Sequence, residues 1–204
     1  MRRVARRSGA WNTDRVNTPA HLILSAAVFA RTDRRRVNAA ALAGGMLPDL
    51  SLYLIGAWMM TIGGQSPELF FGTTYYSDWV QSVMSVDNSI PLWSLAVLFA
   101  LLSRTPAAIA FATCGWMHVV SDFLLHNDDA RAQFWPLGDW VFHSPVSYWD
   151  PAHHGDIAGL VEIGIVTVLL IVLWRRFSGW PARLAIALAG LAQLAPAIIW
   201  RLAF

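Results

Sequence analysis

The chain has 204 residues, of which 56% are hydrophobic and only 14% are charged, with a formal net charge of +2. Soluble domains carry about 25% charged residues, so this composition is that of a membrane protein. All fifteen basic residues are arginines that flank apolar segments, which argues against a nucleic-acid partner. The single cysteine, Cys114, excludes an internal disulfide and a cysteine-rich zinc site.

The first sixteen residues, MRRVARRSGAWNTDRV, form a basic and then polar extension. Together with the apolar run 22–30 they imitate a secretory signal peptide. However, His21 heads that run and RTDRRR follows it, where a cleavage site requires small residues. We therefore expect residues 1–16 to be a retained extension and residues 17–204 to form a single helical domain.

Six apolar stretches predict an all-α bundle that crosses a membrane several times. A membrane-spanning helix needs about 20 apolar residues, and four of the stretches reach that length. One other stretch is shorter, and the first could be a half-span or a re-entrant helix. We expect five or six membrane helices, within residues 18–30, 38–60, 89–103, 105–125, 156–174 and 182–200.

Two polar segments, 61–88 and 126–155, are rich in turn-forming and aromatic residues, and we expect both to be loops. With six spans, both lie on the same face of the membrane. The arginine counts of the two faces, eight against seven, do not set the orientation. If the first stretch is re-entrant, the N-terminal arginines join the larger group. We then expect a bacterial inner-membrane protein whose polar loops face the extracytoplasmic side.

The strongest chemical signal is the sequence His118-x-x-x-Asp122-x-x-x-His126. A spacing of four residues places such side chains on one face of a helix. Imidazole nitrogens and carboxylate oxygens are ordinary ligands of zinc, manganese and iron. The pattern therefore predicts a divalent-metal site, with zinc favoured. The alternative is a histidine and an aspartate that pair with each other inside the bundle.

Further imidazoles and carboxylates follow this motif, and five of the six histidines lie at or after His118. Ionisable groups at membrane depth cost roughly 2.5–3.5 kcal/mol each, so their concentration favours a metal or proton-handling site. We expect some of them to be additional ligands and others to transfer protons. The candidate ligands are His126, His153 and His154, and the candidate catalytic residues are Asp128, Asp139 and His143.

Two residues in earlier apolar stretches are candidates for the same site. Asp49 follows a glycine pair and a proline that favour a helix break, and His21 lies on the first turn of its stretch. If the first two helices run in opposite directions, both residues lie toward the face that carries the second polar loop. His118 and Asp122 approach that same face. The alternatives are an aspartate in a loop between two short helices, and a histidine that caps its own helix.

Three polar residues in or beside the loops are weaker candidates. Asp87 and Asn88 precede the helix expected at 89–103 and could be ligands, although capping of that helix is the simpler interpretation. Arg131 could receive a phosphate group, but an arginine in a polar loop is more often solvated.

Three segments resemble a known family: NTPAHLILSAAVFA, AGGMLPDLSLY, and HVVSDFLLHNDD with the downstream FWPLGDWVFHSPVSYWDPAHHG. They are similar to predicted membrane-bound metal-dependent hydrolases of the YdjM-like type, and most to a subgroup labelled as cobalamin biosynthesis proteins. The resemblance covers about residues 17–160 and implies a distant relation to zinc-dependent phospholipase C and P1-type nucleases. It also implies metal binding at His21, Asp49, His118 and Asp122.

One departure from the family pattern concerns the residues before the third helix. Many relatives carry a histidine-serine pair there, whereas this chain has Asp87-Asn88-Ser89. The resemblance therefore fixes neither the number of ions nor the activity.

Together these features predict a membrane-embedded hydrolase of a lipid or another amphiphilic phosphoester. A divalent ion would lower the pKa of bound water toward about 7 and polarise the phosphoryl oxygen. The substrate could keep its acyl tails in the lipid while its headgroup reaches the site. One alternative is a metal or proton transporter, or its accessory subunit, which needs access from both membrane faces. The other is a non-catalytic scaffold with a closed structural metal site.

Overall fold

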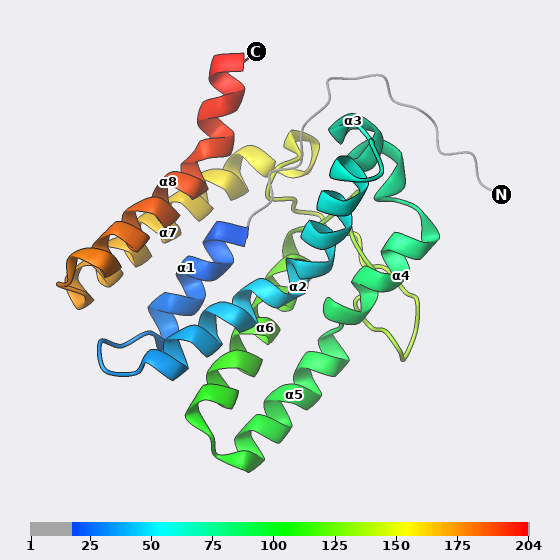
Figure 1. Cartoon of the computed structure of the whole chain (residues 1–204). Helices are drawn as coiled ribbons and strands as arrows, with labels where there is room; N and C mark the ends of the chain where they lie inside the picture. The colour runs from blue at the N-terminus through cyan, green and yellow to red at the C-terminus, as the bar shows by residue number, and fades with distance from the viewer. Residues whose placement is uncertain (1–17, 204) are drawn as a thin grey trace.

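The computed structural model describes residues 18–203, with side chains to residue 195, and its regular secondary structure over this range is entirely helical. The prediction of an all-α fold is confirmed, whereas the expected extension 1–16 lies outside the described residues. The helices, shown in Figure 1, are α1 (Thr18–Phe29), α2 (Arg35–Thr61), α3 (Pro67–Leu69), the π-helix η1 (Phe70–Thr74), α4 (Asp78–Asp87), α5 (Ile90–Ser103), α6 (Pro106–Leu125), the 3-10 helix η2 (Pro151–His153), α7 (Gly155–Arg176) and α8 (Trp180–Ala203).

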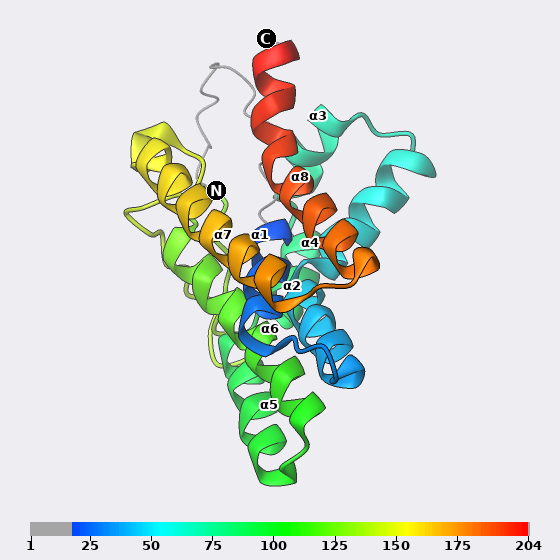
Figure 2. The same cartoon turned by 90° about the vertical axis from the view of Figure 1, so that its left-hand side faces the viewer.

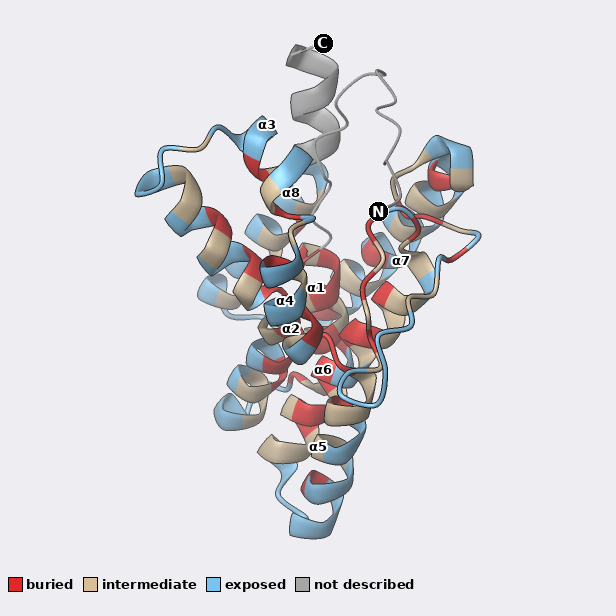
Figure 3. Ribbon diagram, turned by 90° about the vertical axis from the view of Figure 1, so that its right-hand side faces the viewer, coloured by how far each residue is buried: buried red, intermediate tan, exposed pale blue. Residues whose placement is uncertain are grey.

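Helices α1, α2 and α6 form the centre of the bundle. Helix α2 packs against both α1 and α6, α5 packs along α6, and α7 packs on α1 together with α8. Helices α7 and α8 contact each other and lie at one edge of the molecule in Figure 1, which is the side that faces the viewer in Figure 2. Buried residues concentrate where α1, α2 and α6 meet, as the red segments in Figure 3 show. Neighbouring helices therefore cover the centre of the bundle on several sides, and the residues there are buried.

Within the described residues, four helical segments are long and apolar enough to cross a membrane: α2, the consecutive pair α4–α5, α6 and α7. Large apolar side chains are exposed on them, among them Leu54, Phe99 and Leu160. Lipid solvates such surfaces, whereas water does not, so these helices fit a membrane protein. The first and last expected spans correspond to shorter apolar helices, α1 and the segment Trp180–Ala195 of α8. The count of five or six spans therefore stays a prediction.

The prediction of a loop over 61–88 is wrong for most of that segment, which forms α3, η1 and α4. Ser66 starts α3 as an N-cap, because its hydroxyl accepts a hydrogen bond from the backbone of Leu69. Val80 and Met84, one helical turn apart in α4, are fully buried in a cluster with apolar residues of η1 and α2. Burial of this apolar face against α2 stabilises a helix where composition alone suggested a loop.

The segment from residue 126 to the start of α7 is irregular apart from η2. It folds back on the end of α6 through hydrogen bonds to that helix. The Gln133 side chain donates to the carbonyl of Val119 at 3.0 Å, and the Ser144 hydroxyl donates to the carbonyl of Leu124 at 2.6 Å. These bonds hold a polar loop against the last turns of α6.

Helix α2 is continuous past Asp49, so the interpretation of this residue as a loop aspartate between two short helices is wrong. The glycine pair serves close packing instead. A Cβ at Gly44 would lie 2.0 Å from the backbone oxygen of Phe111 in α6, and one at Gly45 would lie 2.4 Å from Oγ of Ser25 in α1. Small residues at such contacts let helices approach each other closely in a membrane.

Candidate metal centre

The site is built around Asp122, which is buried in the last turns of α6. Its Oδ2 lies 3.3 Å from Nε2 of His118, one turn earlier on the same helix face. Its Oδ1 lies 3.1 Å from Nε2 of His21 on α1, and the two imidazole rings stack with centroids 3.7 Å apart. The three residues offer ligand atoms that all lie within 4.8 Å of one another. They form a buried group that could hold a metal ion.

Asp49 and His126 extend this group. Oδ1 of Asp49 lies 3.6 Å from Nε2 of His118, and Nε2 of His126 lies 3.6 Å from Oδ1 of Asp122. Two ligands bound 2.0–2.1 Å from a tetrahedral ion lie about 3.4 Å apart, close to these separations. The structure therefore brings together the five predicted ligands that we call the His/Asp cluster: His21, Asp49, His118, Asp122 and His126.

Hydrogen bonds on the far side of two rings aim their Nε2 atoms at the cluster. Nδ1 of His118 lies 2.8 Å from the carbonyl of Gly45, and because a carbonyl only accepts, this nitrogen carries the proton. Nδ1 of His126 lies 2.7 Å from Oδ2 of Asp129, which also accepts a bond from the indole of Trp149 at 3.2 Å. Partners of this kind fix the tautomer and orientation of metal-binding histidines.

The Nε2 atom of His118 gives a direct test of whether a metal fits. It is buried and has no hydrogen-bond partner within the described part of the chain, although carboxylate oxygens of Asp49 and Asp122 lie nearby. An ion coordinated by this nitrogen and by the carboxylate oxygens would give it a direct partner in place of these longer ion-pair contacts. The donor set of imidazoles and carboxylates suits zinc, manganese or iron, so the residues present fit a divalent ion.

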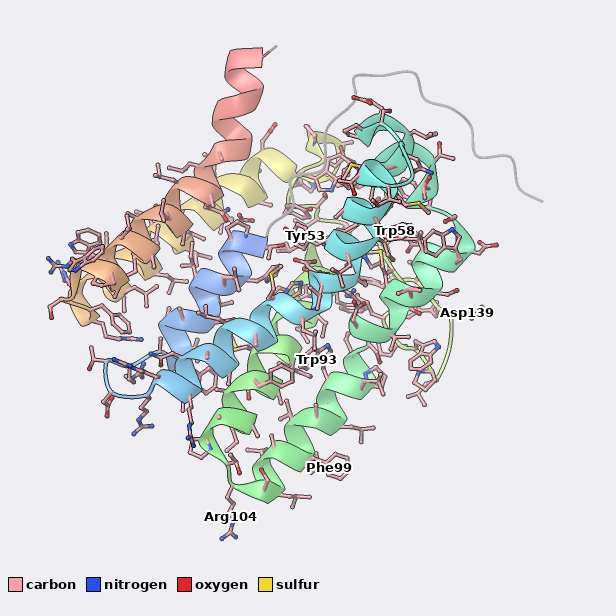
Figure 4. The ribbon with its side chains drawn as sticks, in the orientation of Figure 1. Tyr53, Trp58, Trp93, Phe99, Arg104 and Asp139 are labelled. Carbon is pink, nitrogen blue, oxygen red and sulfur yellow. The ribbon has the colours of Figure 1, made fainter. Side chains whose placement is uncertain are left out.

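The second oxygen of Asp49 is held by α1. The hydroxyl of Thr18 donates to Oδ2 of Asp49, and the hydroxyl of Tyr53 donates to Oγ1 of Thr18 at 2.8 Å. Figure 4 shows Tyr53 beside the first turn of α1. These bonds leave Oδ1 of Asp49 turned toward His118.

Arg131 is buried, so its interpretation as a solvated loop arginine is wrong. Its Nη1 donates to Oδ1 of Asn88 at 2.7 Å and lies 3.7 Å from Oδ2 of Asp122, and its Nε donates to the hydroxyl of Tyr75 at 3.3 Å. Burial alone would lower the pKa of Arg131, but Tyr75 and the carboxylates of Asp122 and Asp49 raise it. The guanidinium is therefore a permanent positive charge next to the cluster.

Asn88 and Asp87 have structural roles. The amide of Asn88 meets the guanidinium of Arg131, and Oδ2 of Asp87 accepts a bond from the backbone of Ser51 at 3.3 Å. Ser89, not these two residues, caps α5, since its hydroxyl accepts a bond from Leu92. The capping interpretation of Asp87 and Asn88 is therefore wrong.

A pocket adjoins the cluster, with a volume of about 30 Å³ that gives room for about two water molecules. An ion in the cluster could therefore keep an open position for water, as catalytic zinc sites do. The polar residues of the pocket wall are His21, Asp49, Tyr75, Asp122, His126, Asp129, Arg131 and Tyr148.

The three candidate catalytic residues do not line this pocket. Asp128, Asp139 and His143 are exposed, and Figure 4 shows Asp139 on the outer side of the loop, beside α4. The tight turn after α6 directs Asp129, not its neighbour Asp128, toward His126. The structure therefore turns Asp129, and not the predicted catalytic residue Asp128, toward the cluster.

Two of the candidate ligands also lie outside the pocket wall. His153 pairs with Asp150, with Nδ1 and Oδ2 2.6 Å apart. His154 is exposed and adopts a left-handed backbone conformation, with φ of 63°, between η2 and α7. Their local contacts at the start of α7 keep both imidazoles out of the His/Asp cluster.

The sequence did not lead us to predict Asp129 or Tyr75 as site residues, and it made Arg131 only a weak candidate. Asp129 stands three residues after His126, a spacing at which the two side chains can meet in a turn, so a signal for it was present. Nothing in the sequence around Tyr75 distinguishes it from the other aromatic residues of its segment. The position of Arg131 depends on the fold of the loop, which composition does not specify.

We expect metal binding to release protons and to strengthen with pH. Burial would lower the pKa of His126, but Asp122 and Asp129 raise it to about 9. Below that pH the imidazole is protonated, so coordination through Nε2 must displace a proton. The metal affinity should rise up to tenfold per pH unit toward pH 9 for this proton alone. Calorimetric titration in buffers of different ionisation enthalpy measures the release.

His126→Gln should release about one proton fewer than the wild type, whereas His153→Gln, outside the cluster, should match the wild type. Metal binding without any proton release at pH 7 would contradict a role for His126 as a ligand.

Neither the family models nor the curated proteins nor the solved structures that we searched contain a match to this chain. The similarity to YdjM-like hydrolases therefore stays a prediction, and the candidate site rests on its own geometry.

Proposed function

We propose that this protein is a membrane-embedded metal-dependent hydrolase of a lipid or another amphiphilic phosphoester. The observation that carries the proposal is Nε2 of His118, a buried nitrogen without a hydrogen-bond partner in the described chain. It lies between the carboxylates of Asp49 and Asp122, and both of these residues line a pocket with room for water. A metal ligand beside a water-sized space is the arrangement of a hydrolytic metal site.

The charges of the pocket wall support one divalent ion. Three carboxylates, Asp49, Asp122 and Asp129, face one guanidinium, Arg131. With neutral imidazoles this leaves an excess of two negative charges, which one divalent ion neutralises. Burial of uncompensated charge costs several kcal/mol per group, so the wall favours a cation. In the metal-free protein, the proton on His126 offsets part of the excess.

The residues of the chain have distinct roles in this mechanism. A divalent ion would supply the Lewis acid that activates water and polarises the phosphoryl oxygen. His21, His118 and Asp122 would hold it, with His126 oriented by Asp129. Oδ1 of Asp49, whose other oxygen is fixed by Thr18, can accept a proton from water in the pocket.

The surroundings of the site suit an amphiphilic substrate. The pocket wall contains apolar and aromatic side chains, including Leu52 and Phe71, beside its charged groups. Large apolar side chains are also exposed on α2 and α5, among them Leu54 and Phe99. A substrate could therefore keep its tails against these helices. We place the protein in a bacterial inner membrane, with the site toward the extracytoplasmic face.

The proposal is tested on the full chain purified in detergent. We expect about one zinc, manganese or iron ion per chain by elemental analysis. Hydrolysis of a panel of phospholipids and water-soluble phosphoesters should stop with a chelator and return with added metal. Stoichiometric metal without turnover on the panel would contradict the enzyme and support a structural site. Metal flux in liposomes would instead support the transporter.

A further inference from the structure

We propose that Arg131 is the residue that binds an anionic oxygen of the substrate, a phosphate-type oxyanion, in the pocket beside the His/Asp cluster. This inference rests on the proposed function and names the group that would recognise the substrate. Arg131 lines the pocket together with the cluster residues, and only 8% of it is exposed. The charge thus lies inside the site and not on the surface of the loop.

The guanidinium is held in place from two sides. Asn88 accepts a bond from Nη1 of Arg131, and its own amide nitrogen donates to the carbonyls of Pro48 in α2 and Met84 in α4, each at 2.9 Å. Tyr75 accepts a bond from Nε on the other side. A side chain fixed in this way loses little rotamer entropy when it binds an anion.

The hydrogen-bond partners of Arg131, Asn88 and Tyr75, are uncharged acceptors that position the guanidinium. Its ion-pair contact with Oδ2 of Asp122 is longer, at 3.7 Å from Nη1, and is not a hydrogen bond. A guanidinium has five N–H groups, and the hydrogen bonds to Asn88 and Tyr75 use two of them. The other three N–H groups do not take part in these two bonds. These remaining donors match the oxygens of a phosphate group, which guanidinium binds in bidentate fashion.

Arg131 also lies close to the candidate metal. Nη1 of Arg131 and Nε2 of His118 approach the same oxygen of Asp122, at 3.7 and 3.3 Å. An oxyanion in the adjoining pocket could therefore meet both the guanidinium and an ion held by His118. With a divalent ion in place the wall is neutral overall instead of negative, so an incoming anion would no longer be repelled by net negative charge, and the ion and Arg131 would be the groups that attract it.

The test measures anion binding by metal-loaded full-length protein in detergent. Inorganic phosphate is one probe, and phosphatidic acid in mixed micelles is the other. Arg131→Met should weaken binding of inorganic phosphate by roughly 10–100-fold, the loss expected for charge-assisted hydrogen bonds. Arg131→Lys keeps a point charge but not the fork, so it should bind more weakly than the wild type and more tightly than Arg131→Met. The matched control is Arg104→Met, at the exposed turn between α5 and α6 (Figure 4).

Metal content and thermal stability are measured on the same samples. Wild-type affinity for both probes in Arg131→Met, with its metal retained, would overturn the inference and leave the proposed function intact. If the wild type holds no metal, the proposed function fails. The affinity of the wild type for inorganic phosphate, compared with that of Arg131→Met, then still tests the role of Arg131 by itself. If Arg131→Met does not fold, Arg131→Lys decides, and unchanged affinity there overturns the inference.

The two probes distinguish the source of the oxyanion. Weakened binding of both supports recognition of a lipid headgroup. Weakened binding of inorganic phosphate alone supports recognition of a soluble phosphate compound by the same residue.

Discussion

Replacing His118 or Asp122 with alanine should leave the purified protein with less than about a tenth of the wild-type metal content and without chelator-sensitive hydrolysis. Changes that only disturb the partners of metal-binding residues already cost about 10–100-fold in affinity, so loss of a ligand should cost at least as much. Asp122 contributes both oxygens to the cluster, one toward His21 and one toward His118. Its loss should therefore have the larger effect, and elemental analysis with activity assays measures both.

The control for these variants is an exposed histidine that lies outside the cluster. His154→Ala should keep the wild-type metal content and activity. Because His118→Ala leaves buried carboxylates without their partner, thermal unfolding and gel filtration must show that the variant is folded. His118→Gln serves as a second variant of similar size. Full metal occupancy in folded His118→Ala and Asp122→Ala would contradict the metal centre.

Gly44→Ala should destabilise the protein by more than about 3 kcal/mol, because the new methyl group has no room. Its Cβ would lie 2.0 Å from the backbone oxygen of Phe111, and a backbone atom cannot move aside as a flexible side chain can. The helices α2 and α6 would have to separate, which would also draw Asp49 away from His118. We expect a lower temperature of unfolding in detergent and a lower metal content.

Alanine variants at two other glycines provide the matched comparison for Gly44→Ala. A Cβ at Gly45 would meet Oγ of Ser25 at 2.4 Å, a side-chain atom that can rotate, so Gly45→Ala should cost less than Gly44→Ala. A Cβ at Gly164 in α7 would meet nothing within 4 Å, so Gly164→Ala should be neutral or stabilising by up to about 1 kcal/mol. Equal stability of all three variants would show that α2 and α6 do not pack this closely.

The core of the site was predictable because helical periodicity and chain direction specify it. The spacing of His118 and Asp122 places both on one face of α6 without any knowledge of the tertiary fold. Antiparallel packing of α1 and α2 then brings His21 and Asp49 toward the same end of the bundle. Each of these inferences needs only the direction of a helix and the position of a residue along it.

The loop residues were not predictable in the same way. The choice between Asp128 and Asp129 depends on the backbone conformation of a single turn, for which the sequence offers two equivalent carboxylates. The burial of Arg131 depends on Asn88 and Tyr75, which lie 43 and 56 residues away in the chain. Spacing rules do not describe contacts of that kind.

The helices also divide into those that the sequence predicted and one that it did not. Apolar stretches long enough for a membrane identified α2, α6 and α7, whereas the short helix α4 was hidden in a segment rich in turn-forming residues. Its signal was the pair Val80 and Met84, whose spacing of four residues puts both on the face that packs against α2. A short amphipathic helix gives only one such pair, and this is too little to outweigh composition.

The hydrogen bond between Thr18 and Asp49 has a consequence for biosynthesis. Helices α1 and α2 precede α6 in the chain and are therefore synthesised first, so Thr18 is available to Asp49 before His118 and Arg131 are. In that interval Thr18, supported by Tyr53, is a partner within the nascent helical hairpin. The carboxylate of Asp49 therefore has a donor from residues that are already in place, and it keeps this donor in the folded structure.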